Sequence, residues 1–342
     1  MMYFATFFDK NYLSRGIVLY NSLQEQKIDF KLFILCLDNE TSIFFLNNNL
    51  TYSNVITLSL EDFEFNDAEL SVAKNNRSVI EYYFTLSPCL PLYLLKKFEL
   101  PHICTLDADI LFLSSPQSLF NYLSDYSIII TPHKFSNEIL EYNQYGTYNV
   151  SFQIFKNDAC GLQCLQQWRK QCITWCGDYY DEKNNRFADQ KYLDTWPIDY
   201  PNKVKVLDDS FSGIAPWNLN NYALAYSNNS FTSDGNPLIY YHFQHFKILN
   251  KWIALNGFEN YKVTINNTIK KLYYLYWKKI QNINLQIQVK KDTSKRVDLS
   301  KKIILQLIHD QKAIIKIGNN IFEINTNNLP YFFIRVIRKL YG

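Results

Sequence analysis

The chain has 342 residues, of which 47% are hydrophobic and 20% are charged, and this balance excludes a disordered protein. Gly and Pro number only 9 and 10, so collagen-like and low-complexity chains are excluded as well. The formal net charge of +3 gives no sign of a nucleic-acid partner.

The charge is unevenly distributed along the chain. Residues 262–342 contain 16 Lys and Arg against 4 Asp and Glu, a net charge of +12, whereas residues 1–261 have a net charge of −9. Such an asymmetry predicts an acidic body that holds the chemistry and a basic extension that contacts an anionic partner.

Membrane and export signals are missing from the sequence. No stretch approaches the roughly 18 to 20 apolar residues of a spanning helix. The start, MMYFATFFDK, lacks the basic n-region and long apolar run of a signal peptide. We therefore expect a cytoplasmic protein.

The cysteines do not predict a disulfide framework, because their number, seven, is odd and no export signal is present. Four of them follow a C-x3-C-x7-C-x3-C spacing: Cys160, Cys164, Cys172 and Cys176. A zinc site is one interpretation, but the C-x2-C spacing is missing. Each pair falls one helical turn apart, which favours packing inside a helix.

Strands and helices alternate in the first part of the chain. The hydrophobic pattern predicts strands at 2–8, 30–36, 55–58, 102–106 and 127–131, and helices at 11–24 and 78–98, the latter interrupted by two prolines. This order indicates an open α/β sheet with a parallel core, which binds ligands beyond the carboxyl ends of its strands. The GxGxxG and GxxxxGK[ST] motifs are both missing, so dinucleotide dehydrogenases and P-loop NTPases lose their support.

The remaining chain divides into two parts. Residues 142–246 lack a clean period, and we expect a long irregular and functional segment there. In the tail, the pattern predicts a basic helix at 267–280, a hairpin at 313–324 and an amphipathic basic helix at 330–341. The last helix is interpreted either as an anchor on an anionic membrane surface or as a helix docked on protein, and both remain open.

The segment Asp107-Ala-Asp109 follows the predicted strand 102–106. Two carboxylates two residues apart on an extended backbone point to the same side. At the carboxyl end of a strand they can hold a hard divalent cation, which often also binds substrate phosphate oxygens. A solvated loop would explain the pair equally well, because an isolated D-x-D is common.

Five short segments in order resemble a known family: Tyr3-Phe-Ala-Thr-Phe-Phe-Asp9, Leu106-Asp-Ala-Asp-Ile110, Tyr148-Asn-Val-Ser-Phe152, Phe187-Ala-Asp-Gln-Lys191 and Tyr241-His-Phe243. Together they resemble the GT-A-fold nucleotide-sugar glycosyltransferases, in particular glycosyltransferase family 8 and its bacterial relatives, over residues 1–251. The resemblance implies one Rossmann-like GT-A catalytic domain with a mostly parallel central sheet at 1–255. A small basic extension would occupy 262–342.

The resemblance also implies a metal site. Asp107, Asp109 and His242 would hold Mn²⁺, or alternatively Mg²⁺, which stabilises the diphosphate leaving group of the donor. His245 and Lys247 would reach the phosphate oxygens.

The nucleotide side of the site is implied by further positions. Thr6, Phe7 and Asp9 at the end of the first strand would contact base and ribose, and Ala108 would border the same nucleotide-sugar. Arg77 matches the basic residue that the family places at the diphosphate, which a guanidinium can bind bidentately.

The sugar side is implied by three positions. Asn149 would hydrogen-bond the donor sugar, and Asp189 and Gln190 would contact sugar hydroxyls near the reacting carbon. Ser151 stands where the family has Gly, which puts the local backbone geometry in doubt. Asp189 and Asp234 are the candidates for a base or nucleophile.

The predicted protein is therefore a metal-dependent hexosyltransferase. The resemblance favours a UDP-sugar donor, a saccharide, lipid-linked or protein acceptor, and retention of the anomeric configuration. The basic tail would bring the enzyme to the inner membrane face. The alternatives are a sugar-nucleotide-forming nucleotidyltransferase, against which the Gly-free segment Phe8-Asp-Lys-Asn-Tyr12 argues, and a catalytically inactive carbohydrate-binding protein.

Overall fold

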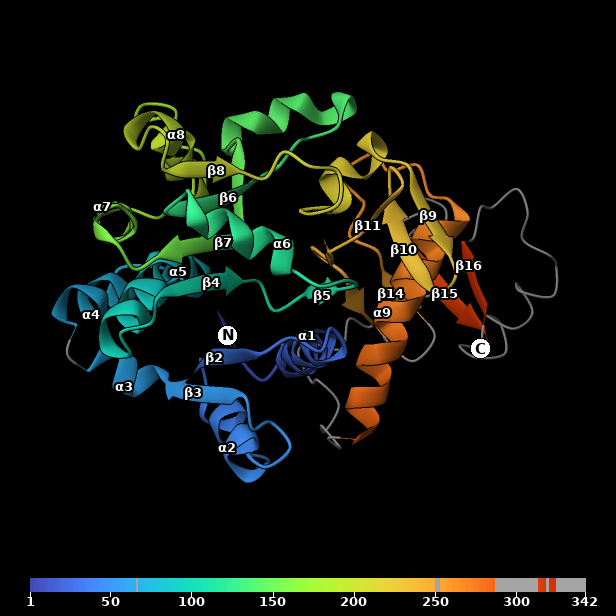
Figure 1. The fold of residues 1–342 in the computed structure, drawn as a ribbon, viewed down its shortest axis with the longest axis horizontal. Helices are drawn as coiled ribbons and strands as arrows, with labels where there is room; N and C mark the ends of the chain where they lie inside the picture. Colours follow the sequence, from blue (N-terminus) through green and yellow to red (C-terminus); the bar gives the residue numbers. More distant parts are fainter. Residues whose placement is uncertain (66, 250–252, 287–312, 318–319, 324–342) are drawn as a thin grey trace.

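The computed structural model describes residues 1–65, 67–249, 253–286, 313–317 and 320–323. Its centre is a seven-stranded sheet with the strand order β3-β2-β1-β4-β7-β6-β8 (Figure 1). These strands are β1 (Met2–Phe8), β2 (Phe30–Cys36), β3 (Val55–Ser59), β4 (His102–Leu106), β6 (Ile128–Pro132), β7 (Tyr148–Lys156) and β8 (Val204–Val206). The pairs are parallel except those of β7, which runs antiparallel to β4 and β6. The predicted α/β class with a mostly parallel sheet is confirmed.

Helices and short strands surround this sheet. The α-helices are α1 (Leu13–Glu25), α2 (Asn39–Asn47), α3 (Leu60–Glu64), α4 (Ala68–Asn75), α5 (Val79–Lys97), α6 (Gln117–Phe120), α7 (Ala159–Thr174), α8 (Trp196–Asp199) and α9 (Asn267–Gln286). The 3₁₀ segments are η1 (Asn121–Ser124), η2 (Asn137–Tyr145), η3 (Gln190–Thr195) and η4 (Pro216–Asn221). The strands outside the central sheet are β5 (Ile110–Phe112), β9 (Leu224–Ser227), β10 (Ser230–Ser233), β11 (Asn236–Pro237), β12 (Tyr240–His242), β13 (Lys247–Ile248), β14 (Ile253–Leu255), β15 (Ala313–Ile317) and β16 (Asn320–Glu323).

Both faces of the central sheet are buried because helices cover each of them. Successive side chains of a strand point to opposite faces. On one face Phe4 of β1 packs in a core with Ile17 of α1. On the other, Phe33 of β2 packs in a second core with Leu90 of α5 and Trp168 of α7. This two-sided burial explains the near-continuous apolar runs that made the strands predictable.

Two expectations were wrong in detail. Helix α5 continues as one element through Pro88 and Pro91, where an interruption was expected. The segment 142–246 was expected to be irregular, yet it contains β7 and α7. Cys160, Cys164 and Cys172 lie on α7 as free thiols. Among the described residues, the group close enough to share a cation contains no cysteine, which favours packing over zinc binding.

The beginning of the basic extension packs on the body. Helix α9 buries Leu272, Tyr276 and Trp277 in the same core as β1, and the ring of Tyr276 stacks on Phe243 at 3.8 Å between centroids. The predicted hairpin is confirmed in its strands, because β15 pairs antiparallel with β16 and also with β14. Residues 318–319 of its turn and the predicted helix 330–341 lie outside the described residues, and the domain division at 255–262 stays a prediction.

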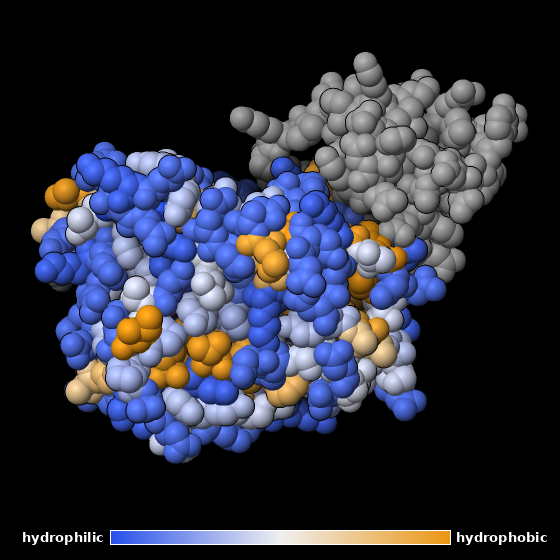
Figure 2. All heavy atoms as spheres, turned by 90° about the horizontal axis from the view of Figure 1, so that it is seen from above, coloured by the Kyte–Doolittle hydropathy of each residue, from blue (hydrophilic) through white to orange (hydrophobic). Residues whose placement is uncertain are grey.

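Membrane spanning was not expected from the sequence. None of the helices in the described part of the chain combines the length and the apolar character needed to cross a bilayer. The face drawn in Figure 2 is mainly hydrophilic, with apolar side chains in small separate groups.

Candidate functional site

The two carboxylates follow β4 directly. The backbone N–H of Asp107 donates to the carbonyl of Ser151 on β7 (3.0 Å), which holds the first carboxylate at the edge of the sheet. The chain then turns, and the N–H of Ile110 donates to the carbonyl of Asp107 (3.3 Å) before β5 begins. The Asp107 side chain is 41% exposed and that of Asp109 only 10%, so one carboxylate faces solvent and the other is held inside.

The pairing of β12 with β5 positions His242 beside this turn. Strand β12 runs antiparallel to β5 and places His242 opposite Ile110. The N–H of Phe243 donates to the carbonyl of Asp109 (3.0 Å), and that of His242 to Ile214 (2.9 Å). As a result, Nε2 of His242 lies 3.0 Å from Oδ1 of Asp109 and 3.5 Å from Oδ2 of Asp107. The structure therefore brings together the three side chains that the sequence predicted as metal ligands.

These three side chains fit a divalent cation. One ligand atom from each of them lies within 4.8 Å of the others. Both ring nitrogens of His242 are buried, and neither has a hydrogen-bond partner among the described residues, despite the short contact to Asp109. Two carboxylates and an imidazole form a donor set that suits Mn²⁺, with Mg²⁺ as the harder alternative.

The electrostatics of the group show how much charge it concentrates. Although the Asp107 side chain is partly exposed, the protein atoms packed around its carboxyl and the charge of Asp109 raise the pKa of Asp107, while His242 opposes this shift. Burial would also raise the pKa of Asp109, but the charges of His242 and Arg15 outweigh it and lower that pKa. Burial would lower the pKa of His242, but the two carboxylates raise it above its ordinary value. The two carboxylates therefore favour a positive charge beside them.

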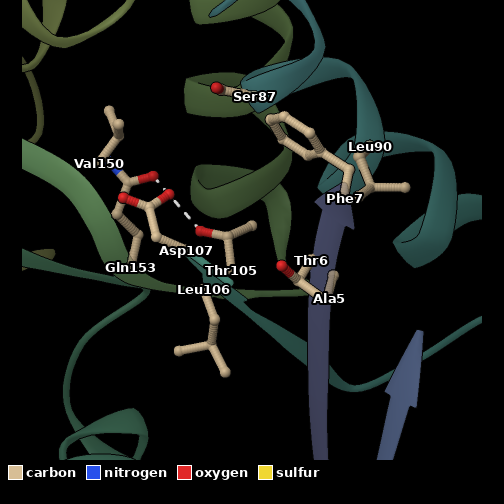
Figure 3. Close-up of a pocket in the computed structure, with 10 residues that line it drawn as sticks. All are labelled: Ala5, Thr6, Phe7, Ser87, Leu90, Thr105, Leu106, Asp107, Val150 and Gln153. Carbon is tan, nitrogen blue, oxygen red and sulfur yellow. Dashed lines mark hydrogen bonds between the residues drawn. The ribbon is translucent and has the colours of Figure 1, made fainter. Parts of the chain in front are cut away.

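A pocket opens beside Asp107 at the carboxyl ends of β1 and β4 (Figure 3). This is where an open α/β sheet binds its ligands. Thr6 and Phe7 line it together with Asp107, so the predicted nucleotide-binding residues of β1 meet the predicted metal ligand. The complete lining is Ala5, Thr6, Phe7, Ser87, Leu90, Thr105, Leu106, Asp107, Val150 and Gln153.

Asp189 is buried at the start of η3. Its backbone carbonyl accepts a hydrogen bond from the indole N–H of Trp168 (2.9 Å), so a core side chain fixes its position. Burial, to which the charge of Asp107 adds, raises the pKa of Asp189 to about 7. Ala188 before it has a left-handed φ of 45°, a strain typical of functional sites. The amide of Gln190 donates to the carbonyl of Tyr145 (2.9 Å).

Asn149 and Ser151 lie buried on β7. Ser151 is not among the described residues with a positive φ, so the position does not require the glycine that the resemblance led us to expect. The doubt about the local backbone is thereby removed.

Arg77 is not brought to the carboxylates by any contact that the structure describes. Its guanidinium donates to the hydroxyl of Thr85 and to the carbonyls of Cys172 (2.5 Å) and Ile173. These carbonyls belong to the last turn of α7, where they have no partner within the helix. The contacts are those of a helix cap, and the predicted role at a diphosphate stays untested.

Replacing Arg77 by methionine distinguishes the two roles. We expect the free energy of unfolding to fall by about 2 kcal/mol, because the helix-end carbonyls lose their donors. The KM for a nucleotide-sugar should change less than about twofold. Urea unfolding and initial rates check both values, with exposed Lys170→Met on the same helix as the control. A large rise in KM without loss of stability would restore the diphosphate role.

The other predicted residues lie in or beside turns of the chain. Asp9 accepts hydrogen bonds from the backbone and side chain of Asn11 before α1. Ala108 is buried between the two carboxylates. His245 and Lys247 are exposed just after His242. Asp234 accepts from the N–H of Ala223 (2.9 Å) within the small β9-β10-β11 sheet, a local turn contact.

Two residues near the carboxylates were missed in the sequence. Arg15 in the first turn of α1 lowers the pKa of Asp109 through its charge, and it donates to the carbonyl of Phe246 (3.0 Å). Its guanidinium lies 4.5 Å from the ring centre of Tyr12. The pKa of Tyr12 is raised, first because its hydroxyl is partly shielded from water and then by the charge of Asp109. Their position directly after β1 was the available signal.

Comparison with known proteins gives relatives and structural neighbours. No family model matches the chain. It is 28% identical over 276 residues to the uncharacterized protein YfnD of Bacillus subtilis (strain 168), covering 80% of this chain and 87% of that protein.

The similar solved structures include two glycosyltransferases. Mouse xyloside xylosyltransferase 1, in its apo form, has a TM-score of 0.46 at 13% identity, with 71% of this chain and 97% of that chain covered. The galactosyltransferase LgtC, in complex with donor and acceptor sugar analogues, has a TM-score of 0.48 at 13% identity, with 71% and 87% covered.

Proposed function

We propose that the protein is a metal-dependent glycosyltransferase that moves a hexose from a nucleoside-diphosphate sugar, a UDP-sugar, to an acceptor hydroxyl. The observation that carries this proposal is the convergence of Asp107, Asp109 and His242 at the carboxyl end of β4, beside a pocket that reaches the end of β1. The diphosphate of a nucleotide-sugar is stabilised by a positive charge beside it. The three side chains are suited to hold a cation that carries this charge.

In this function Asp107, Asp109 and His242 hold Mn²⁺ or Mg²⁺. When bound, the ion supplies positive charge that stabilises the departing nucleoside diphosphate. Arg15 adds a fixed positive charge near Asp109. We propose that the exposed His245, in the loop after β12, and the exposed Lys247, at the start of β13, bind phosphate oxygens. The pairing of β5 with β12 keeps the ligands in register before any substrate arrives.

Residues other than the metal ligands bind the nucleoside and the sugar of the donor. Thr6 and Phe7 line the pocket for the nucleoside, and Asp9 follows the end of β1. Asp189 and Asn149 are buried polar groups that suit sugar hydroxyls. We propose Asp189 and Gln190 as the residues next to the reacting carbon, with retention of its configuration. Asp189 is the buried carboxyl that can bear negative charge as the sugar becomes cationic.

We further propose an acceptor class and a location for the enzyme. A saccharide, lipid-linked or protein acceptor remains compatible with the site. The +12 net charge of residues 262–342 supports contact with an anionic membrane face, and the proposed contact helix 330–341 lies outside the described residues.

The proposal is tested by incubating the full chain and Mn²⁺ with UDP-glucose, UDP-galactose and UDP-N-acetylglucosamine. We expect free UDP from at least one of them, increased by an acceptor. Pyrophosphate-dependent exchange would instead indicate a nucleotidyltransferase, and binding without turnover would indicate an inactive carbohydrate-binding protein. Either outcome would overturn the proposal.

A further inference from the structure

We infer that Ser151 is a positioning residue that fixes the side-chain amide of Asn149, so that this position offers the ligand a hydrogen-bond donor and selects an acceptor oxygen. The inference rests on the proposed function, since the ligand is the nucleotide-sugar. Nothing in the motif itself indicates such a role, because the resemblance led us to expect a glycine at 151.

The orientation of the amide follows from its two partners. Oδ1 of Asn149 accepts hydrogen bonds from the backbone N–H of Ser151 (3.1 Å) and from its hydroxyl (2.6 Å). A backbone N–H can only donate, so the atom that faces it must be the carbonyl oxygen of the amide. The usual uncertainty between the oxygen and nitrogen of an asparagine is therefore resolved by chemistry.

The other end of the amide is left without a partner. Nδ2 of Asn149 is buried and has no hydrogen-bond acceptor among the described residues. The whole residue is 3% exposed. A buried donor without a partner is costly, and a native structure that keeps one usually does so for a function. A ligand oxygen that accepts this N–H removes the cost.

Ser151 also connects this amide to the metal group. Its backbone carbonyl accepts the N–H of Asp107 (3.0 Å), while its hydroxyl holds Asn149. The residue is itself buried, at 3% exposure, so its hydroxyl is in place before the ligand binds. Ser151 therefore contacts both Asp107 and Asn149, and it fixes how the predicted metal ligand and the amide donor lie relative to each other.

The acceptor oxygen can come from the sugar or from the diphosphate. We assign it to a sugar hydroxyl, because the carboxyl of Asp189, whose charge interacts with that of Asp107, has a buried oxygen without a hydrogen-bond partner among the described residues and would repel a phosphate once ionised. A hydroxyl can accept from Asn149 and donate to a carboxylate at the same time.

The test is calorimetric titration of the full chain, with Mn²⁺ present, by UDP-galactose, UDP-glucose and UDP alone. We expect Ser151→Ala to bind the preferred nucleotide-sugar about tenfold more weakly and UDP with less than about twofold change. Ser151→Thr should recover most of the affinity. Asn149→Asp, which replaces the donor by an acceptor, should lose at least as much as Ser151→Ala. Ser124→Ala, an exposed hydroxyl on η1, is the matched control.

Each result of the titration bears on either the inference or the proposed function. An unchanged affinity of Ser151→Ala for the nucleotide-sugar would overturn the inference. An equal loss for the nucleotide-sugar and UDP would also overturn it, because it would show a general structural effect. If no nucleotide-sugar binds the wild type, the proposed function fails instead, and crystal structures then decide the inference. The hydroxyl of Ser151 must contact Oδ1 of Asn149 in the wild type. In Ser151→Ala, where Oδ1 keeps the backbone N–H but loses the hydroxyl, the amide must shift or become less ordered; an unchanged amide overturns the inference.

Discussion

Replacing Asp109 by asparagine is expected to lower the rate of sugar transfer by about three orders of magnitude. The substitution keeps the shape of the side chain and removes the more buried of the two predicted carboxylate ligands. The contact of 3.0 Å to Nε2 of His242 also loses its charge, so the imidazole loses the partner that raises its pKa. Initial rates at saturating donor, over a series of Mn²⁺ concentrations, measure both the transfer rate and the apparent affinity for the ion.

The matched control is Asp208→Asn, which removes a carboxylate that is 77% exposed and paired with Lys205. This variant should transfer at the wild-type rate, because an exposed pair of this kind contributes little. If Asp109→Asn kept more than about a tenth of the wild-type rate, the buried carboxylate could not be a ligand of the reaction's metal ion.

Replacing Asp189 by asparagine should make the protein more stable at alkaline pH while lowering transfer by about two orders of magnitude. Burial raises the pKa of this carboxyl to about 7 in the folded protein. Its value in the unfolded chain is about 3.9, so folding retains a proton between the two values. The wild-type stability contributed by this group is therefore lost as the pH rises from about 4 to about 7.

Asparagine cannot ionise, so Asp189→Asn should not lose stability in this way as the pH rises. The difference between the two pKa values corresponds to a penalty on the order of 4 kcal/mol above about pH 7. Urea unfolding of the wild type and Asp189→Asn should show a gain in stability at about pH 8 that shrinks towards about pH 4. Exposed Asp125→Asn is the control. A gain of the same size at both pH values would show that Asp189 is not buried as an ionisable group.

The central strands could be predicted because each is a local run of apolar residues. Strands β1, β2 and β4 are covered on both faces, so their sequences read as continuous hydrophobic segments. Strand β7 was missed, and helix α7 was indicated only by the spacing of its cysteines. Polar residues at Asn149, Ser151 and Gln153 interrupt the apolar pattern of β7, and they are buried because they face the site rather than solvent.

The metal group was predictable only in part. Asp107 and Asp109 were visible as a local motif, whereas the place of His242 depends on the pairing of β12 with β5, which no local pattern encodes. The resemblance supplied that residue. Arg77 and Asp234 show the opposite case, because their side chains make contacts with Cys172 and Ala223 that cannot be read from the sequence.

Arg15 shows a third limit on prediction from the sequence, because its place in the site depends on a contact that is distant along the chain. A basic residue in the first turn of a helix next to a strand end is usually a surface residue, and its sequence environment carries no further signal. It becomes part of the site because the loop after β12 returns to α1 and accepts its hydrogen bond through Phe246. Long-range contacts of this kind follow from the whole topology rather than from a motif.

Metal-dependent cleavage of the donor by this protein can be tested directly in one measurement. Release of free UDP from UDP-sugars by the wild-type full chain is followed with Mn²⁺, after removal of the ion with a chelator, and after its restoration. We predict release with Mn²⁺, loss on chelation and recovery when the ion returns, with no recovery in Asp109→Asn. Release that continues at the same rate in the chelator, or no release from any nucleotide-sugar at saturating Mn²⁺, would contradict the account.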